Sequence, residues 1–325
     1  MGTITERGGD YQARGVCLVA EQKEAVRYTF TIFTPTFNRA HTLQRVYTSL
    51  ARQTYRDFEW LVMDDGSTDN TSQLIETWKG ESNFPIRSYK QENMGKHVAF
   101  NRGVEHAEGE LLLVLDSDDE CVPHALEQLK HHWDTIDPQL RAGFIGVTVL
   151  CADQNGNLVG DLFPKDVMDS DPLELRYRYK VKGEKWGFQR TDVLRRYPFP
   201  ENLKQTYVPE DIIWNKIARK YKTRFVNEQL RIYWVEGPSL VHNQNPGKNA
   251  LGGQLQHCDA LNNDIKWFRF APLRFTLSAL HYSRFSFHIG TGLYAQSRAL
   301  KNNVAKLLWL LMLPAGYLVY LKDIY

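Results

Sequence analysis

The 325-residue sequence is poor in cysteine and in net charge. Its 4 cysteines lie far apart and form no C-x-x-C pair, so neither a structural zinc site nor a dense disulfide framework is expected, and a reducing compartment is favoured. Lysine and arginine number 40 against 38 aspartates and glutamates, and the net charge of +2 excludes a nucleic-acid binder that works by bulk charge. A hydrophobic content of 42% with 24% charged residues indicates a globular chain and excludes a disordered or multi-span membrane protein.

Several catalytic and targeting patterns are also absent from the sequence. It contains no H-x-x-x-H or H-E-x-x-H arrangement, no G-x-S-x-G elbow and no phosphate-cradling P-loop, which argues against a histidine-ligated metal centre and a serine hydrolase. The first fifteen residues are polar, and the apolar run at 16–20 is too short for a signal peptide. We therefore expect a cytoplasmic protein.

The sequence does contain a regular alternation of strands and helices from residue 28 to residue 116. Strands rich in β-branched, aromatic or aliphatic residues are predicted at 28–35, 58–63, 85–90 and 110–116. Between them, apolar residues at three-to-four-residue spacing predict helices at 41–53, 70–78 and 96–107. This order predicts an α/β fold whose mostly parallel sheet is covered on both faces and binds ligands at the carboxyl ends of its strands.

The rest of the chain is less regular. Its predicted elements are a helix at 122–137, a strand at 143–150, a helix at 208–221 and a strand at 230–236. Residues 153–207 follow no spacing rule and are expected to be irregular and to shape a substrate pocket, and the Asn, Gln and Gly-rich stretch that starts at His242 is predicted to be a mobile loop. We expect a polar extension over 1–27, a main domain over 28–241 and a helical region over 242–325.

The apolar run at 307–321 is shorter than the roughly 20 residues that a spanning helix needs, and Pro314 interrupts it. Trp, Tyr, Lys and Arg flank the run, as is typical of a segment that lies in an anionic membrane interface. We therefore expect peripheral association with the inner face of the cell membrane. A buried terminal helix pair and a membrane span are the alternatives.

Polar residues follow each of the three strongest predicted strands, in the segments PTFNR, DDGSTD and DSDDE. The carboxyl ends of parallel strands meet at one edge of a sheet, so these segments are expected to share a cleft. The carboxylates of Asp116, Asp118 and Asp119 are hard oxygen ligands that suit Mg²⁺ or Mn²⁺. A lone D-x-D is common in solvated turns, and it is the second acidic turn, with Asp64 and Asp65, that favours a ligand site.

Five motifs taken together resemble a family 2 glycosyltransferase with the nucleotide-sugar-binding GT-A fold. They are TPTFNR, DDGSTDNT, NMGKHVAFNRGV, LDSDD and VPEDIIW, and the resemblance covers roughly residues 28–236. The GKH, GEKWGFQRTDVL and VPEDIIWNKIARKY stretches are similar to the subset of the family that modifies bacterial cell-surface polymers. The resemblance implies a nucleotide-sugar half at 28–120 and an acceptor half at 121–241. It also implies inverting transfer of a hexose or N-acetylhexosamine from a UDP-sugar to a hydroxyl of a glycan, polymer or lipid-linked acceptor.

The same resemblance implies a nucleoside site formed by Pro35, Thr36, Asn38, Arg39, Asp64 and Asp65. A carboxylate accepts the imide N–H of uracil, whereas cytosine presents an acceptor there, so Asp65 would favour UDP over CDP. For Asp64, a local cap of the turn is the stronger alternative. Lys96, at a helix start, would place a cation near phosphate or sugar oxygens, with a surface lysine as the alternative.

For the chemistry, the resemblance assigns Asp118 to the divalent metal, Mn²⁺ or Mg²⁺, with Asp116 at the ribose or donor sugar and Asp119 as a further possible ligand. His242 is a weaker metal candidate. A metal neutralises the charge that develops on the departing diphosphate.

The E-D pair of the VPEDIIW motif is the second acidic site. Carboxylates in the first turn of a helix also offset the helix dipole, so the sequence alone leaves that structural role ahead for Glu210 and Asp211. The resemblance makes Asp211 the catalytic base and Glu210 its positioning neighbour. A single displacement then inverts the anomeric centre, so no nucleophilic residue is needed.

Two rival functions remain. A nucleotidyltransferase that makes sugar nucleotides shares a related sheet but needs a Gly-rich, basic loop after the first strand, and TPTFNRAH lacks that glycine cluster. A glycan-binding subunit that kept the fold and lost catalysis is the other rival. The presence of Asp118 and Asp211 argues against it.

Overall fold

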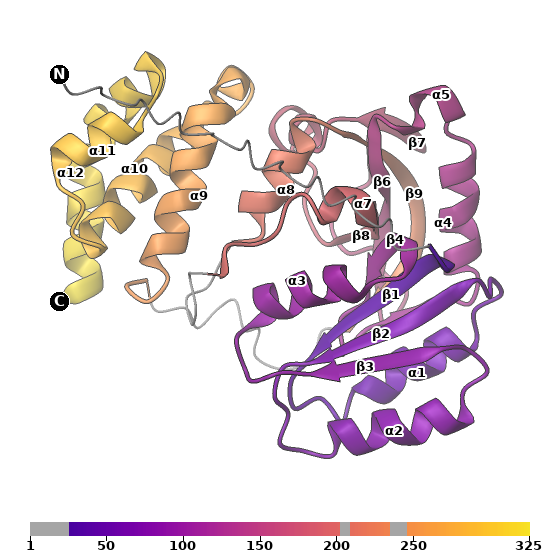
Figure 1. Cartoon of the computed structure of the whole chain (residues 1–325). Helices are drawn as coiled ribbons and strands as arrows, with labels where there is room; N and C mark the ends of the chain where they lie inside the picture. Colours follow the sequence, from indigo (N-terminus) through magenta and orange to yellow (C-terminus); the bar gives the residue numbers. More distant parts are fainter. Residues whose placement is uncertain (1–25, 202–208, 235–245) are drawn as a thin grey trace, which may run out of the picture.

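The computed structural model describes residues 26–201, 209–234 and 246–325. Within them lies a nine-stranded sheet in the order β3-β2-β1-β4-β8-β6-β9-β5, with β7 paired to β9 (Figure 1). The strands are β1 (Tyr28–Thr36), β2 (Phe58–Asp64), β3 (Ile86–Lys90), β4 (Gly109–Val114), β5 (Glu120–Cys121), β6 (Phe144–Asp153), β7 (Val167–Ser170), β8 (Lys185–Arg190) and β9 (Lys222–Tyr233).

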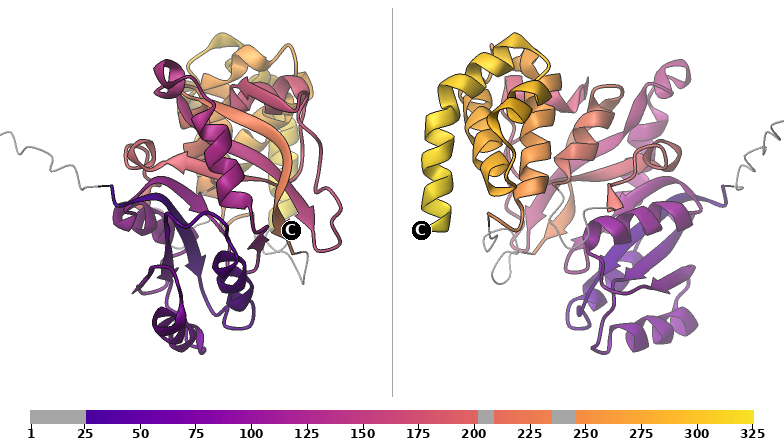
Figure 2. Two further views of the ribbon diagram at one scale, coloured as in Figure 1. Left: turned by 90° about the vertical axis from the view of Figure 1, so that its right-hand side faces the viewer. Right: turned by 60° about the vertical axis from the view of Figure 1, so that its left-hand side comes forward.

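Helices cover both faces of this sheet (Figures 1 and 2). Those of the first half are α1 (Leu43–Ala51), α2 (Thr71–Glu81), α3 (Lys96–His106), α4 (Ala125–Asp134) and α5 (Pro138–Arg141). The middle of the chain forms α6 (Pro172–Glu174), the π-helix η1 (Leu175–Tyr179), α7 (Thr191–Leu194) and α8 (Asp211–Ala218). The last helices are α9 (Ala250–Asn263), the 3₁₀-helix η3 (Ile265–Trp267), α10 (Pro272–His288), α11 (Leu293–Ala299) and α12 (Asn303–Ile324).

Strands β1 to β4 form the parallel part of the sheet, with β1 paired to β2 and β4, and β2 to β3. Successive side chains of a strand point to opposite faces, and both faces are apolar here. Phe30 and Ile32 of β1 pack with α1, α2 and α4, whereas Phe33 packs with α3, α7 and α8. The predicted α/β class and the βαβαβ order are confirmed for this half.

Beyond β4 the sheet is mixed, because β8 lies antiparallel between β4 and β6. The expectation of an irregular stretch over 153–207 was therefore wrong at the residues KWGFQR. A glycine permits this strand, since a Cβ added to Gly187 would lie 2.0 Å from the carbonyl oxygen of Val147. Lysine and arginine at the ends of a six-residue strand, together with this glycine, hide the usual strand pattern from the sequence.

Several predicted bounds also differ from the structure. The helices expected at 122–137 and 208–221 are shorter, and β9 begins at Lys222, well before the strand expected at 230–236. Helix α9 starts at Ala250, inside the segment expected to be a loop. His242 and the extension at 1–25 lie outside the described residues.

The C-terminal helices α9 to α12 form a bundle that packs beyond α8 (Figures 1 and 2). A buried charge network joins α8 to α9. The Arg219 guanidinium lies 2.6 Å from the Asp259 carboxylate and 2.8 Å from that of Asp264, which is fully buried. Because removing one partner of such a network would leave an unpaired buried charge, the network ties the bundle to α8.

Helix α12 is continuous through Pro314. Ala305, Trp309 and Gly316 are buried, and Asp323 accepts a hydrogen bond of 2.7 Å from Arg284 of α10. By length and composition α12 could cross a membrane. It has 22 residues, its most apolar 18-residue stretch has a mean hydropathy of 1.7, and only 17% of that stretch is buried in the protein.

Candidate active site

A pocket of about 940 Å³ opens between the carboxyl end of β4, the start of α3 and the first turn of α8. Lys96, Asp116, Glu210 and Asp211 all line it, so the structure brings the acidic loop and the E-D pair into one cavity. Much of the remaining wall is aromatic, and its rings are Phe100, Trp186, Phe199, Trp214 and Tyr233. Such a cavity suits a ligand with apolar faces and several polar groups.

Lys96 stands between the two acidic groups. Gly95 precedes it as the N-cap of α3 with φ of 92°, a left-handed conformation that favours glycine. The Lys96 ammonium lies 3.2 Å from Asp116 and 3.6 Å from Glu210, and the nearby Asp116 carboxylate raises the pKa of Lys96. A cation in this position can bind an anionic ligand group that enters the pocket.

Asp116 is held by two cations from distant elements, Lys96 and Arg231 of β9. Arg231 donates to Asp116 at 3.0 Å and is almost completely buried. Burial opposes ionisation of Asp116, but Lys96 and Arg231 outweigh it and lower its pKa to about 2. The carboxylate is thus negative at neutral pH.

Asp119 is occupied by protein donors. One of its oxygens accepts hydrogen bonds from Arg231, and the other accepts one of 3.0 Å from the backbone N–H of Trp234. Burial raises the pKa of Asp119 to about 6, against the effect of Arg231. Asp119 could bind a metal only if Arg231 moved away from it. In this structure the Asp119 carboxylate is paired with Arg231 instead.

Asp118 differs from both neighbours. Its carboxylate is 38% exposed, and its one ion pair among the described residues is to Arg39, at 3.6 Å. The residue is thus open to a hard cation. With Asp116 it supplies at most two carboxylates, which fits Mg²⁺ or Mn²⁺ held jointly with phosphate oxygens and water. Among the described residues, no cluster of three or more His, Cys, Asp or Glu residues could hold a metal by protein ligands alone.

Asp211 is the first residue of α8, and both of its carboxylate oxygens have partners. Arg176 of η1 donates to one oxygen at 2.7 Å, and Gln256 of α9 donates to the other at 2.9 Å. Glu210 is the N-cap residue and accepts a hydrogen bond of 3.4 Å from the Trp214 indole. The two adjacent acids therefore face the pocket in different surroundings.

The turn at 64–67 is built around its carboxylates. Asp64 is buried and accepts hydrogen bonds from the Ser67 backbone N–H at 2.7 Å and from the Ser72 hydroxyl at 2.8 Å. These contacts confirm the alternative of a local cap for Asp64.

Asp65 accepts three hydrogen bonds that organise the loop before α3. The donors are the Gln91 side chain at 2.7 Å, the Met94 backbone N–H at 3.0 Å and the Gly95 backbone N–H at 2.9 Å. Asp65 is itself buried. Its expected role as acceptor for uracil stays a prediction, and in this arrangement both of its oxygens already accept hydrogen bonds from the protein.

The other residues of the expected nucleoside site lie at the end of β1. Pro35 and Thr36 are the last two residues of this strand. The buried Thr36 hydroxyl has no hydrogen-bond partner among the described residues. Asn38 has φ of 54°, and its side-chain oxygen accepts a hydrogen bond of 2.8 Å from the Thr68 backbone N–H. Asn38 thus ties the β1 loop to the acidic turn, and the orphaned Thr36 hydroxyl is a free polar group at this edge.

Sequence reasoning missed three residues that contact the proposed acids: Arg231, Arg176 and Gln256. Only Arg231 left a signal, because an arginine in the apolar segment LRIYW needs an ionic partner if the strand is buried. Arg176 and Gln256 lie in segments without a charge or spacing pattern, and only the tertiary fold brings them to Asp211.

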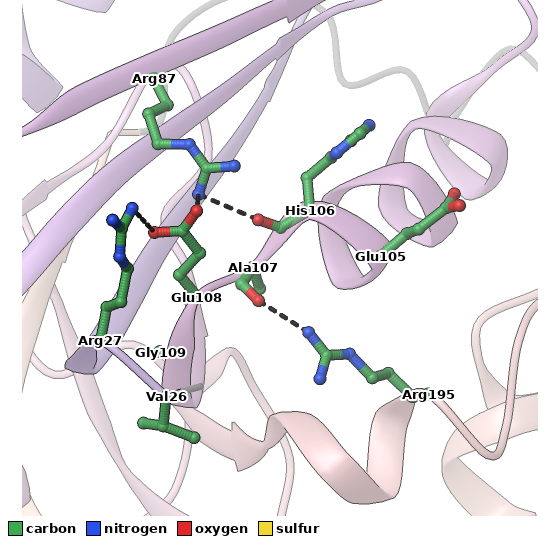
Figure 3. Close-up of a pocket in the computed structure, with 9 residues that line it drawn as sticks. All are labelled: Val26, Arg27, Arg87, Glu105, His106, Ala107, Glu108, Gly109 and Arg195. Atoms are coloured by element: carbon green, nitrogen blue, oxygen red, sulfur yellow. Dashed lines mark hydrogen bonds and ion pairs between the residues drawn. The ribbon is translucent and has the colours of Figure 1, made fainter. Parts of the chain in front are cut away.

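A second pocket, of about 290 Å³, lies at the opposite, amino-terminal ends of the parallel strands (Figure 3). Arg27 and Arg87 both pair with Glu108, at 3.2 and 3.1 Å. Arg195 donates to the Ala107 carbonyl, at 2.8 Å. Arg27 is paired with Glu108, Arg87 is paired with both Glu108 and Glu59, and Arg195 binds the carbonyl end of α3, so we assign no ligand to this pocket.

Comparison with known proteins shows which families the chain is similar to. Residues 31–160 match the model of the family described as "Glycosyl transferase family 2". A Campylobacter jejuni protein named GalNAc(5)-diNAcBac-PP-undecaprenol beta-1,3-glucosyltransferase is 25% identical over 73% of this chain and 75% of its own length. Other relatives are matched over only 31% and 39% of their length.

Solved structures share the fold. Staphylococcus aureus TarS 1-349, in complex with UDP-GlcNAc, has a TM-score of 0.59 at 18% identity, over 90% of this chain and 92% of TarS 1-349. The mannosyltransferase PcManGT from Pyrobaculum calidifontis, in complex with GDP-Man and Mn²⁺, has a TM-score of 0.51 at 18% identity, over 91% of this chain and 88% of its own. Residues 31–160 are thus similar to family 2 glycosyltransferases, and the chain shares the GT-A fold of the solved glycosyltransferase structures.

Proposed function

We propose that this glycosyltransferase moves a hexose or N-acetylhexosamine from a UDP-sugar to a hydroxyl of a glycan, polymer or lipid-linked acceptor, with inversion at the anomeric carbon. The observation that supports this most strongly is the single pocket that Lys96 and Asp116 share with Glu210 and Asp211. The first two can bind the donor, and a carboxylate on the facing wall can take a proton from the acceptor. One displacement in that arrangement inverts the anomeric centre.

The donor side of the pocket fits a divalent metal. Asp118 would hold Mg²⁺ or Mn²⁺ together with Asp116, and the ion would stabilise negative charge on the departing diphosphate. The Mn²⁺ complex of PcManGT supports this choice. Lys96 would contact a phosphate or sugar oxygen and so leave Glu210, from which it lies 3.6 Å in this structure.

The donor class is tested by calorimetric titration with UDP, CDP and GDP, each with and without Mn²⁺. We expect UDP to bind, and its affinity to fall on chelation of the metal. Binding of GDP instead of UDP would move the donor to the class bound by PcManGT. No nucleotide binding at all would favour the glycan-binding subunit, and turnover of a nucleoside triphosphate would favour the nucleotidyltransferase.

Asp211 is proposed as the general base and Glu210 as its positioning neighbour. Asp211→Asn should lower kcat by about 10²-fold or more while UDP affinity stays unchanged, because only proton transfer is lost. Asp192→Asn is the matched control, since Asp192 also lies in the first turn of a helix but on the surface, with 58% of its side chain exposed. If Asp211→Asn turns over at the wild-type rate, the base is another residue.

We also propose that the C-terminal helices lie on the inner face of the cell membrane. Leu307, Leu310, Leu311 and Leu318 of α12 are all 58% to 65% exposed, and their spacing places them on one face of the helix. The opposite face of α12 packs on α10, whose Arg284 binds Asp323. A spanning α12 would have to leave α10 or carry it into the bilayer, and this favours a helix in the interface.

The charge of the bundle supports the same orientation. Residues 246–325 contain nine lysines and arginines but three aspartates. All three aspartates are paired with arginines inside the protein, Asp259 and Asp264 with Arg219 and Asp323 with Arg284. The outward charge is therefore basic, as anionic lipid headgroups require.

Flotation with phosphatidylglycerol vesicles tests this proposal, with phosphatidylcholine vesicles for comparison. Leu310→Glu combined with Leu318→Glu should abolish binding to the anionic vesicles. The control combines Leu140→Glu with Leu162→Glu, at leucines that are 62% and 56% exposed elsewhere on the molecule, and should bind normally. Equal binding by both double variants would overturn the proposal, and binding that resists high salt would favour a membrane span.

A further inference from the structure

We propose that Gln256 is a positioning residue for the catalytic base, so that the C-terminal bundle completes the active site. The Gln256 amide donates to one oxygen of Asp211 at 2.9 Å, and its side chain lines the pocket. The residue belongs to α9, outside the part of the chain that matches the family model. This inference rests on the proposed function, in which Asp211 is the base.

The position of Gln256 is fixed by the charge network three residues further along α9. Asp259 lies one helical turn after Gln256 and pairs with Arg219, which follows the last residue of α8. Helix α8 carries Asp211 at its other end. Both ends of α8 are therefore joined to one turn of α9, once by a buried ion pair and once by the hydrogen bond to the base.

The second partner of Asp211 completes the orientation of its carboxylate. Arg176 donates to the other oxygen at 2.7 Å and also to the Asn215 side chain at 3.0 Å. An ionised carboxylate has about four lone-pair sites, so two donors leave room for an acceptor hydroxyl. With donors on both oxygens the carboxylate cannot rotate, and one of its free lone pairs can point steadily into the pocket.

The neighbour of Gln256 on α9 does not compete for this role. Burial lowers the pKa of His257 to about 3, so its ring is neutral near pH 7, and it stacks with His281 and Phe285 of α10. The group that α9 contributes to the base is thus the neutral amide of Gln256. A neutral donor orients the carboxylate without neutralising it.

Gln256→Met removes the hydrogen bond with little change of volume. We expect kcat to fall about 10-fold or more, because a misplaced base loses proton-transfer efficiency, while the donor KM and the UDP affinity stay unchanged. Gln254→Met is the matched control, since Gln254 lies on the same helix but contacts Ser286 and Thr291, at 3.2 and 3.3 Å. A thermal midpoint equal to that of the control would show that the bundle remains folded.

A double-mutant cycle separates positioning from a structural effect. If Gln256 acts through the base, Gln256→Met should have almost no further effect in the Asp211→Asn background. The inference is overturned if Gln256→Met keeps kcat within about twofold of wild type, or if the two substitutions lower kcat independently. A wild-type rate in Asp211→Asn would instead overturn the proposed base itself, so the two failures are distinguishable.

Discussion

The two acidic groups at the edge of the parallel sheet look alike in sequence but differ in their partners. In the turn at 64–67, Asp64 and Asp65 accept hydrogen bonds from five neutral donors, three of them backbone N–H groups, and the Lys90 ammonium lies farther away, 3.7 Å from Asp64. In the loop at 116–119, the carboxylates face cations from distant elements, namely Lys96, Arg231 and Arg39. The carboxylates of the first group fix the conformation of the loops around them. Those of the second group form ion pairs beside the pocket.

The type of donor distinguishes a carboxylate that supports a loop from one that can bind a ligand. Among the described residues, the Met94 and Gly95 backbone N–H groups donate to Asp65, so release of the carboxylate would leave these partly buried N–H groups without that acceptor. Lysine and arginine side chains can turn to a ligand anion instead, and the carboxylates they leave can then accept a metal.

The largest effect is expected at Asp118. Asp118→Ala should lower kcat/KM by about 10²-fold or more and remove the metal dependence of UDP binding, because this carboxylate is the one most open to the ion. The free energy of unfolding should change little, since the side chain has one long ion pair. Asp134→Ala is the control and should keep full activity, since Asp134 is an exposed aspartate that pairs with Lys130.

The next effect is expected at Asp65 and concerns stability. Asp65→Ala leaves three donors without their acceptor, two of them backbone N–H groups, and should lower the free energy of unfolding by about 2–4 kcal/mol in a urea titration. Asp118→Ala serves as the control in the same titration. A stable Asp65→Ala variant that has lost the preference for UDP over CDP would contradict the structural role of Asp65 and support its role as the acceptor for uracil.

The smallest effect is a pH dependence of stability at Asp116. The pKa of Asp116 is lowered to about 2 from 3.8, so the stability it adds is present above pH 4 and is lost as the pH falls toward 2. Over that range the wild type should lose about 2 kcal/mol more than Asp116→Asn, as measured by urea unfolding at each pH. Parallel curves for the two proteins would mean that Lys96 and Arg231 do not stabilise the charged form.

The sequence was sufficient for those parts of the fold that depend on local pattern. The apolar strands β1, β2 and β4 and the acidic residues that follow them could be predicted, because buried parallel strands are nearly continuous apolar runs. Strand β8 could not, since its pairing with β4 and β6 is long-range and its own residues are polar at both ends.

The candidate site divides in the same way. The identities of Asp116, Asp118, Glu210 and Asp211 could be taken from motifs, but their hydrogen-bond partners could not. Gln256 reaches Asp211 only because Arg219 joins α8 to α9, and nothing in the spacing of these residues along the chain indicates it. Which carboxylate is held by backbone groups and which by cations also depends on the tertiary fold.

The central position of β8 has a consequence for synthesis of the chain. Strand β4 lies inside the finished sheet, yet one of its two neighbours emerges from the ribosome about 70 residues later, after roughly 4 to 14 s at ~5–20 residues per second. During that interval the nascent sheet ends in an apolar strand whose edge is unpaired, which is a template for aggregation. Because β8 covers the open edge of β4, we expect the halves at 28–120 and 121–241 to fold as one cooperative unit.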